Sequence, residues 1–124
     1  MKENAVLTTT SLLSIAFMTI HQAVDIFHGQ DANASSVAFV VLIMVVWMYG
    51  TLVLAERRSG YVIILLGSLL GMVVLGVHMS DSRLANSAGG LFFVVILLAL
   101  GVTSAFSAIL AMRGLWNSRS RLAR

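Results

Sequence analysis

The chain has 124 residues, of which 59% are hydrophobic and only 10% are charged, and its formal net charge is +3. Soluble domains carry about 25% charged residues, so this composition excludes a water-soluble globular protein. Cysteine is absent, which excludes disulfides and thiolate metal ligands, and no nucleic-acid partner is expected because no soluble domain accompanies the basic residues.

Four apolar stretches are long enough to cross a bilayer, since a helical crossing needs about 20 predominantly apolar residues. We therefore predict an all-α membrane protein, a four-transmembrane-helix bundle that forms one transmembrane domain over residues 1–124. The predicted spans are residues 5–28, 37–55, 61–80 and 91–112, followed by a basic cytoplasmic tail at 113–124.

The end of the first stretch also permits another interpretation. Ala32-Asn33-Ala34 resembles a signal-peptidase site that follows an apolar run. However, the run is long, and the segment 1–4 before it carries no net positive charge. A retained membrane span is therefore the preferred interpretation.

Lysine and arginine are distributed unequally between the two sides of the predicted membrane. Lys2, Arg57, Arg58 and the arginines of the segment 113–124 share one side, and Arg83 is on the other. Because cytoplasmic loops carry an excess of Lys and Arg, this distribution predicts that both termini are cytoplasmic. We expect a bacterial inner (plasma) membrane protein with its other face turned outward.

Ionisable residues gather at the outer end of the first span. With 100° per residue and His21 taken as zero, Asp25 falls at about 40° and His28 at about −20° on a helix. Ionisable residues that share one stripe of a membrane helix face the protein interior. The stripe therefore predicts a polar site inside the bundle.

The third span carries a second ionisable group, His78 and Asp81, on the same face as Gly67 and Gly71. Two small residues four positions apart allow another helix to approach closely. We expect this face to pack against the first span, so that His28 and Asp25 are level with His78 and Asp81. His21 would then lie about 10 Å deeper, two helical turns down.

Neutral imidazoles and carboxylates are suitable ligands for zinc, copper or iron. The candidate metal ligands are His21, Asp25, His28, His78 and Asp81. A b-type haem held by two of the three histidines His21, His28 and His78 is the alternative ligand, with the glycines of the third span leaving room for it.

The sequence thus predicts a small integral membrane protein that binds a transition metal or haem, for metal handling or electron transfer. The alternative is an accessory or structural subunit of a larger membrane complex, with other subunits or a homo-oligomer as partners besides the lipid bilayer. Histidines at helix ends would then only satisfy local polarity. Phosphate loops, nucleophile elbows and His-Glu-x-x-His motifs are missing from the sequence, so an enzyme is not expected.

Overall fold

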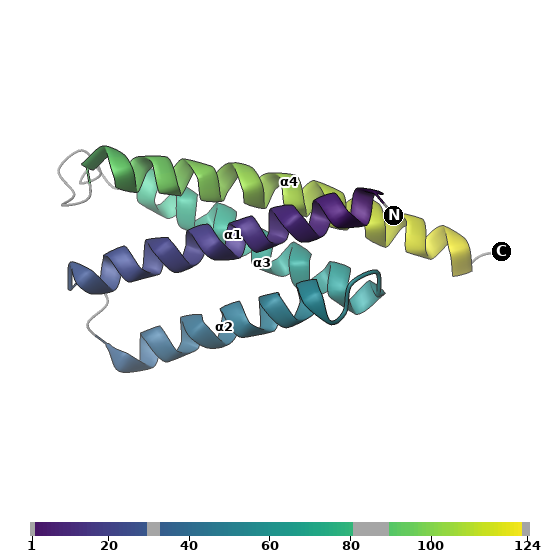
Figure 1. Cartoon of the computed structure of the whole chain (residues 1–124), viewed down its shortest axis with the longest axis horizontal. Coiled ribbons are helices and arrows are strands. Elements are labelled where there is room, and N and C mark those ends of the chain that lie inside the picture. Colours follow the sequence, from purple (N-terminus) through teal and green to yellow (C-terminus); the bar gives the residue numbers. More distant parts are fainter. Residues whose placement is uncertain (1, 30–32, 81–89, 123–124) are drawn as a thin grey trace.

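The computed structural model describes residues 2–29, 33–80 and 90–122, and within these ranges the chain forms four helices and no strand. The helices are α1 (Lys2–Phe27), α2 (Ala34–Leu52), α3 (Arg58–Ser80) and α4 (Gly90–Leu122). They run alternately up and down along one long axis, so α1 and α3 point the same way (Figure 1). Each is long and apolar enough to cross a membrane, which confirms the prediction of an all-helical chain with four such helices.

Two helix ends differ from the ends of the predicted spans. α1 ends at Phe27, and Gly29 follows with a φ of +70°, the left-handed conformation typical of a glycine after a helix. α4 continues to Leu122, through most of the segment predicted as a tail. The chain contains no proline, so nothing in the covalent structure ends α4 at the membrane surface.

The buried faces of α1, α3 and α4 follow a seven-residue repeat, with steps of three and four residues. The buried residues that follow this repeat are Leu7, Ser11, Ser14, Met18 and His21 in α1, Tyr61, Ile64, Ser68 and Gly71 in α3, and Leu97, Leu100, Ser104, Ser107 and Ala111 in α4. This spacing is typical of helices that pack side by side at a small angle, as in coiled coils and many membrane bundles.

The small residues of α3 do not face α1, which corrects the predicted packing. A Cβ added at Gly71 would meet the Oγ of Ser104 on α4, and a Cβ added at Gly67 would meet the indole ring of Trp47 on α2. The glycines therefore allow α3 to approach α4 and α2 closely.

Hydroxyl groups connect the helices in the middle of the bundle. Trp47 of α2 donates its indole N–H to the Oγ of Ser11 over 3.0 Å, and the Ser11 hydroxyl lies 2.8 Å from that of Thr51. Ser14 donates to the hydroxyl of Thr103 on α4 over 3.0 Å. These bonds fix the position of α1 against α2 and α4. They therefore also fix the direction in which the residues near the C-terminal end of α1 project.

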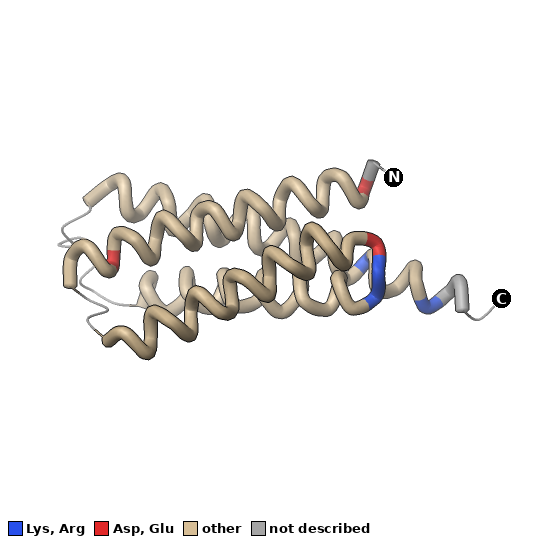
Figure 2. Tube along the Cα trace, turned by 60° about the horizontal axis from the view of Figure 1, so that its bottom comes forward, with Lys and Arg blue, Asp and Glu red and all other residues tan. Residues whose placement is uncertain are grey.

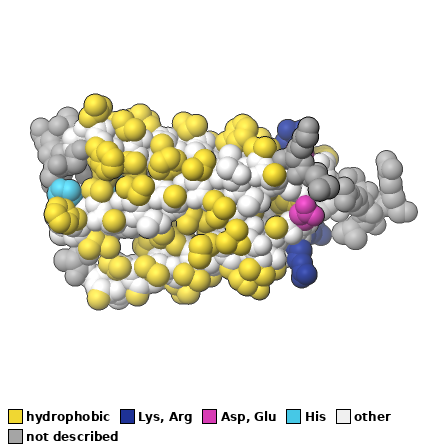
Figure 3. Space-filling model, viewed as in Figure 1, with side chains coloured by type: hydrophobic (Ala, Val, Ile, Leu, Met, Phe, Trp, Pro, Cys, Tyr) yellow, Lys and Arg dark blue, Asp and Glu magenta, His cyan; other side chains and the backbone are white. Residues whose placement is uncertain are grey.

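Charged residues lie at the two ends of the bundle (Figure 2). The described arginines, together with Glu3 and Glu56, gather at the end that holds the chain termini, whereas Asp25 lies near the opposite end. Between the two ends the visible face is covered with hydrophobic side chains (Figure 3). The predicted outer residues Asp81 and Arg83 lie outside the described residues.

Candidate metal centre

Three side chains from two helices meet near the end of the bundle that is opposite the arginines. His21 and Asp25 are one turn apart on α1, and their Nε2 and Oδ2 atoms are 3.3 Å apart. His78 reaches the same carboxylate from α3, with its Nε2 atom 4.0 Å from Oδ2 of Asp25. One ligand atom from each residue lies within 4.8 Å of the other two.

The site is largely shielded from solvent. The side chain of His21 is 2% exposed, that of Asp25 13% and that of His78 30%. The two imidazoles meet edge to face with centroids 4.7 Å apart, and Phe93 of α4 lies 5.3 Å from the His21 ring and 5.8 Å from the His78 ring. Among the three side chains, that of His78 is therefore the most accessible in the part of the chain that the structure describes.

A backbone carbonyl determines which nitrogen of His78 can bind a ligand. Its Nδ1 atom lies 2.9 Å from the carbonyl oxygen of Val74, and a carbonyl only accepts hydrogen bonds, so Nδ1 carries the proton. In a neutral ring the lone pair is then on Nε2, which lies 4.0 Å from Oδ2 of Asp25. A lone pair on Nε2 is what a neutral imidazole offers to a metal ion, so His78 can supply one ligand atom here.

His28 does not belong to this group. It is exposed, its Nδ1 atom is 2.7 Å from the carbonyl oxygen of Val24, and its ring packs edge to face on Phe27. The expected register was therefore wrong, because His78 is level with His21 and not with His28. The backbone N–H of His28 still donates to the carbonyl of Val24, as in a helix, so His28 lies about two turns beyond His21. The position of one residue along its own helix does not show which residue of a neighbouring helix is level with it.

The haem alternative finds no support in this arrangement. The rings of His21 and His78 are in direct contact, which leaves no gap for a macrocycle between them. The space expected at Gly67 is filled by the ring of Trp47. Asp81, the remaining candidate ligand, lies outside the described residues.

Sequence reasoning did not find Phe93 or the carbonyl of Val74. An aromatic residue at the start of an apolar helix does not by itself indicate a binding site. Every residue has a backbone carbonyl, so the sequence does not show which carbonyl will orient a histidine. Only the fold shows that Phe93 closes the site and that Val74 orients His78.

Fold and site together define a bundle of four helices that are long and apolar enough to span a membrane, with a His/Asp group near a metal-binding geometry. No protein-family model matches the chain, and neither curated proteins nor solved structures give a significant match. The function is therefore inferred from the side chains of the site and their chemistry.

Proposed function

We propose that the chain is an integral membrane protein that binds one transition-metal ion through His21, Asp25 and His78. The observation that carries the proposal is that His21, Asp25 and His78 each bring one ligand atom to within 4.8 Å of the other two. Two imidazoles and one carboxylate are the donor set of several zinc and non-haem iron sites.

The distances support a single small ion. With metal–ligand bonds of about 2.0–2.2 Å, the ligand atoms of a tetrahedral site lie roughly 3.3–3.6 Å apart. The 3.3 Å between His21 and Asp25 already satisfies this condition. The 4.0 Å between His78 and Asp25 needs a shift of less than 1 Å, and no pair of the three ligand atoms is more than 4.8 Å apart. A change of side-chain torsion at His78, which is 30% exposed, supplies a shift of this size.

Three protein ligands leave one position of a tetrahedral ion for water or for an incoming ligand. Such open sites exchange their ligands more readily than sites closed by four protein donors. An open position beside the most exposed ligand, His78, suits a protein that takes up or hands over metal and not one that stores it.

The orientation of this site is part of the proposal. Arg57, Arg58, Arg113 and Arg119 lie at one end of the bundle and the His/Asp group is at the other. By the positive-inside rule, the arginines and both termini are then cytoplasmic, and the metal site faces outward from a plasma membrane such as the bacterial inner membrane.

Titration of the purified protein with zinc tests the proposal. We expect one equivalent to bind in mild detergent, and His21→Ala, His78→Ala and Asp25→Asn each to lower the affinity by about 100-fold or more. His28→Ala is the matched control, because it removes a histidine from the same helix end without touching the group. Cobalt substitution adds an absorption spectrum that reports the coordination geometry.

Two results would contradict the proposal. One is a folded protein that binds no metal at any practical concentration. The other is zinc binding that His28→Ala weakens as much as His21→Ala does. The first result would leave a His–Asp group that only satisfies local polarity, as in an accessory subunit, and the second would place the zinc at a site that includes His28.

A further inference from the structure

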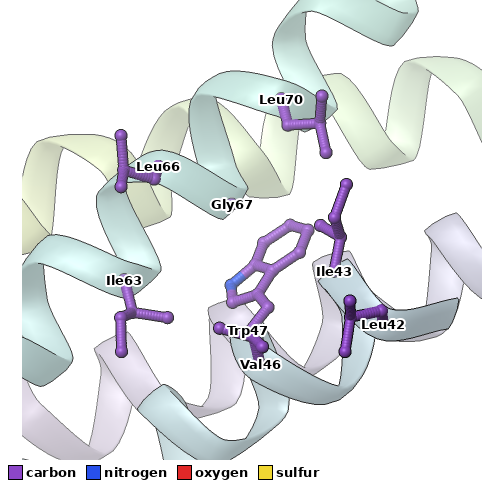
Figure 4. Close-up of a pocket in the computed structure, with 8 residues that line it drawn as sticks. All are labelled: Leu42, Ile43, Val46, Trp47, Ile63, Leu66, Gly67 and Leu70. Carbon is purple, nitrogen blue, oxygen red and sulfur yellow. The ribbon is translucent and has the colours of Figure 1, made fainter. Parts of the chain in front are cut away.

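An apolar groove runs between α2 and α3 on the outside of the bundle (Figure 4). Its volume is about 380 Å³, and Val46 and Trp47 line it from α2, with Ile63, Leu66 and Gly67 on α3. The missing side chain of Gly67 lets the Trp47 indole lie against α3, and the indole N–H donates to Ser11 of α1.

The length of the groove suits a flexible hydrocarbon chain. From Ile63 to Leu70 the axis of α3 rises about 10 Å, a third of a hydrocarbon core of about 30 Å. The lining side chains are apolar throughout, so a polar ligand would find no hydrogen-bond partner among them. In the membrane location proposed above, the available ligand of this shape is a lipid acyl chain.

The end of the groove carries positive charge. Arg57 and Arg58 belong to the connection between α2 and α3, both are exposed, and neither forms an ion pair with a carboxylate in the part of the chain that the structure describes. Glu56 beside them accepts a hydrogen bond from Asn4 over 3.0 Å. The connection therefore has one positive charge in excess.

The distance between these arginines and the groove matches the dimensions of a phospholipid. Ile63 lies five residues beyond Arg58 and thus about 8 Å further along α3. A headgroup layer adds roughly 5–8 Å to each side of the hydrocarbon core. A phosphate bound at the arginines would therefore place the start of its acyl chains at the groove.

We propose that this groove and the two arginines form a binding site for a phospholipid with an acidic headgroup. The acyl chain lies against Trp47 and Gly67, and the guanidinium groups of Arg57 and Arg58 bind the phosphate, with which they form paired hydrogen bonds. A smaller groove between α1 and α2 is lined by Thr19, Ile26 and other residues, and its α2 residues lie within 37–44, toward the start of that helix. Arg57 and Arg58 follow the end of α2, so we expect no preference for an acidic headgroup at the smaller groove.

Fluorescence of Trp47 tests the site. The chain has two tryptophans, so Trp116→Phe leaves Trp47 as the sole emitter. The protein is reconstituted into phosphatidylcholine vesicles that contain equal fractions of either brominated phosphatidylglycerol or brominated phosphatidylcholine. Both leaflets carry the quencher, so the orientation of the protein does not affect the result.

We expect the brominated acidic lipid to quench Trp47 more strongly than the brominated zwitterionic lipid. Each arginine near the surface enriches an acidic lipid by about fivefold, so the preference should vanish in Arg57→Gln/Arg58→Gln and shrink at high salt. Equal quenching by the two lipids in the parent protein, or a preference that survives the double substitution, would overturn the proposal.

Two neighbouring valines on α2 provide a matched test of the groove itself. Val46 lines the groove and is 46% exposed, whereas Val45 is 51% exposed and does not line it. Val46→Phe should fill the groove and reduce quenching by the acidic lipid, and Val45→Phe should not. An equal effect of both substitutions would contradict the assignment of the groove. Zinc binding, measured on the same samples, reports separately on the metal centre.

Discussion

At the scale of single residues, the partner of each polar group decides what the group contributes. Ser11 and Ser107 are both fully buried serines, but Ser11 contacts the hydroxyl of Thr51 and accepts from Trp47. The Oγ of Ser107 has no hydrogen-bond partner among the described residues. In hydrocarbon, a hydroxyl that bridges helices stabilises the bundle only through bonds of this kind.

We therefore expect Ser11→Ala to destabilise the protein and Ser107→Ala to be close to neutral. The loss at Ser11 should be about 0.6–1.7 kcal/mol, the range found for hydrogen bonds between membrane helices. Unfolding of each variant in mixed detergent micelles measures the difference. A larger loss for Ser107→Ala than for Ser11→Ala would contradict the assignment of the bonds.

At the scale of elements, the position of α3 is determined by glycines whose missing side chains admit a neighbour. Gly71 faces the Oγ of Ser104 on α4, whereas Gly76, little more than one turn further along α3, has nothing within 4 Å of an added Cβ. The two glycines look alike in the sequence. Only one of them holds two helices together, and it lies two turns before His78.

Gly71→Leu should separate α3 from α4, and Gly76→Leu should leave the packing unchanged. Overpacking of this kind costs about 1–3 kcal/mol. Because α3 carries His78 into the metal site, we also expect zinc affinity to fall in Gly71→Leu and to stay at the parent value in Gly76→Leu. Thermal unfolding and zinc titration on the same preparations measure both effects, and equal behaviour of the two variants would refute this account of α3.

At the scale of the whole molecule, the two ends of the bundle have different chemistry. One end carries arginines, and the other carries the His/Asp group (Figure 2). An asymmetric charge distribution of this kind orients a protein in its membrane. The proposed outward position of the metal site follows from this asymmetry alone.

Single cysteines can test the orientation cleanly, because the parent chain has none. Ser35 and Ser59 are exposed at opposite ends of the bundle. We expect a membrane-impermeant maleimide to label Ser35→Cys in intact cells and Ser59→Cys only after lysis. The reverse pattern would place the His/Asp group on the cytoplasmic side and would contradict an outward-facing function.

The sequence by itself determined that the chain forms four apolar helices and that its arginines, except Arg83, fall on one side of them. Both properties follow from residues that are close together in the sequence. The helices depend on the length of each apolar run, and the side on which an arginine lies depends on the runs before and after it. The sequence also placed His21 and Asp25 on one face of a helix, because they are four residues, or about one turn, apart.

Only the tertiary structure decided that His78 joins His21 and that His28 does not. That choice depends on the register between α1 and α3, which is determined by the packing of the whole bundle: the bonds of Ser11 and Ser14, and the close approach of α3 to α4 at Gly71. The periodicity of one helix shows which residues share a face, but it carries no information about their height relative to a neighbouring helix. The physical reason is that register depends on side-chain volumes from several helices at once.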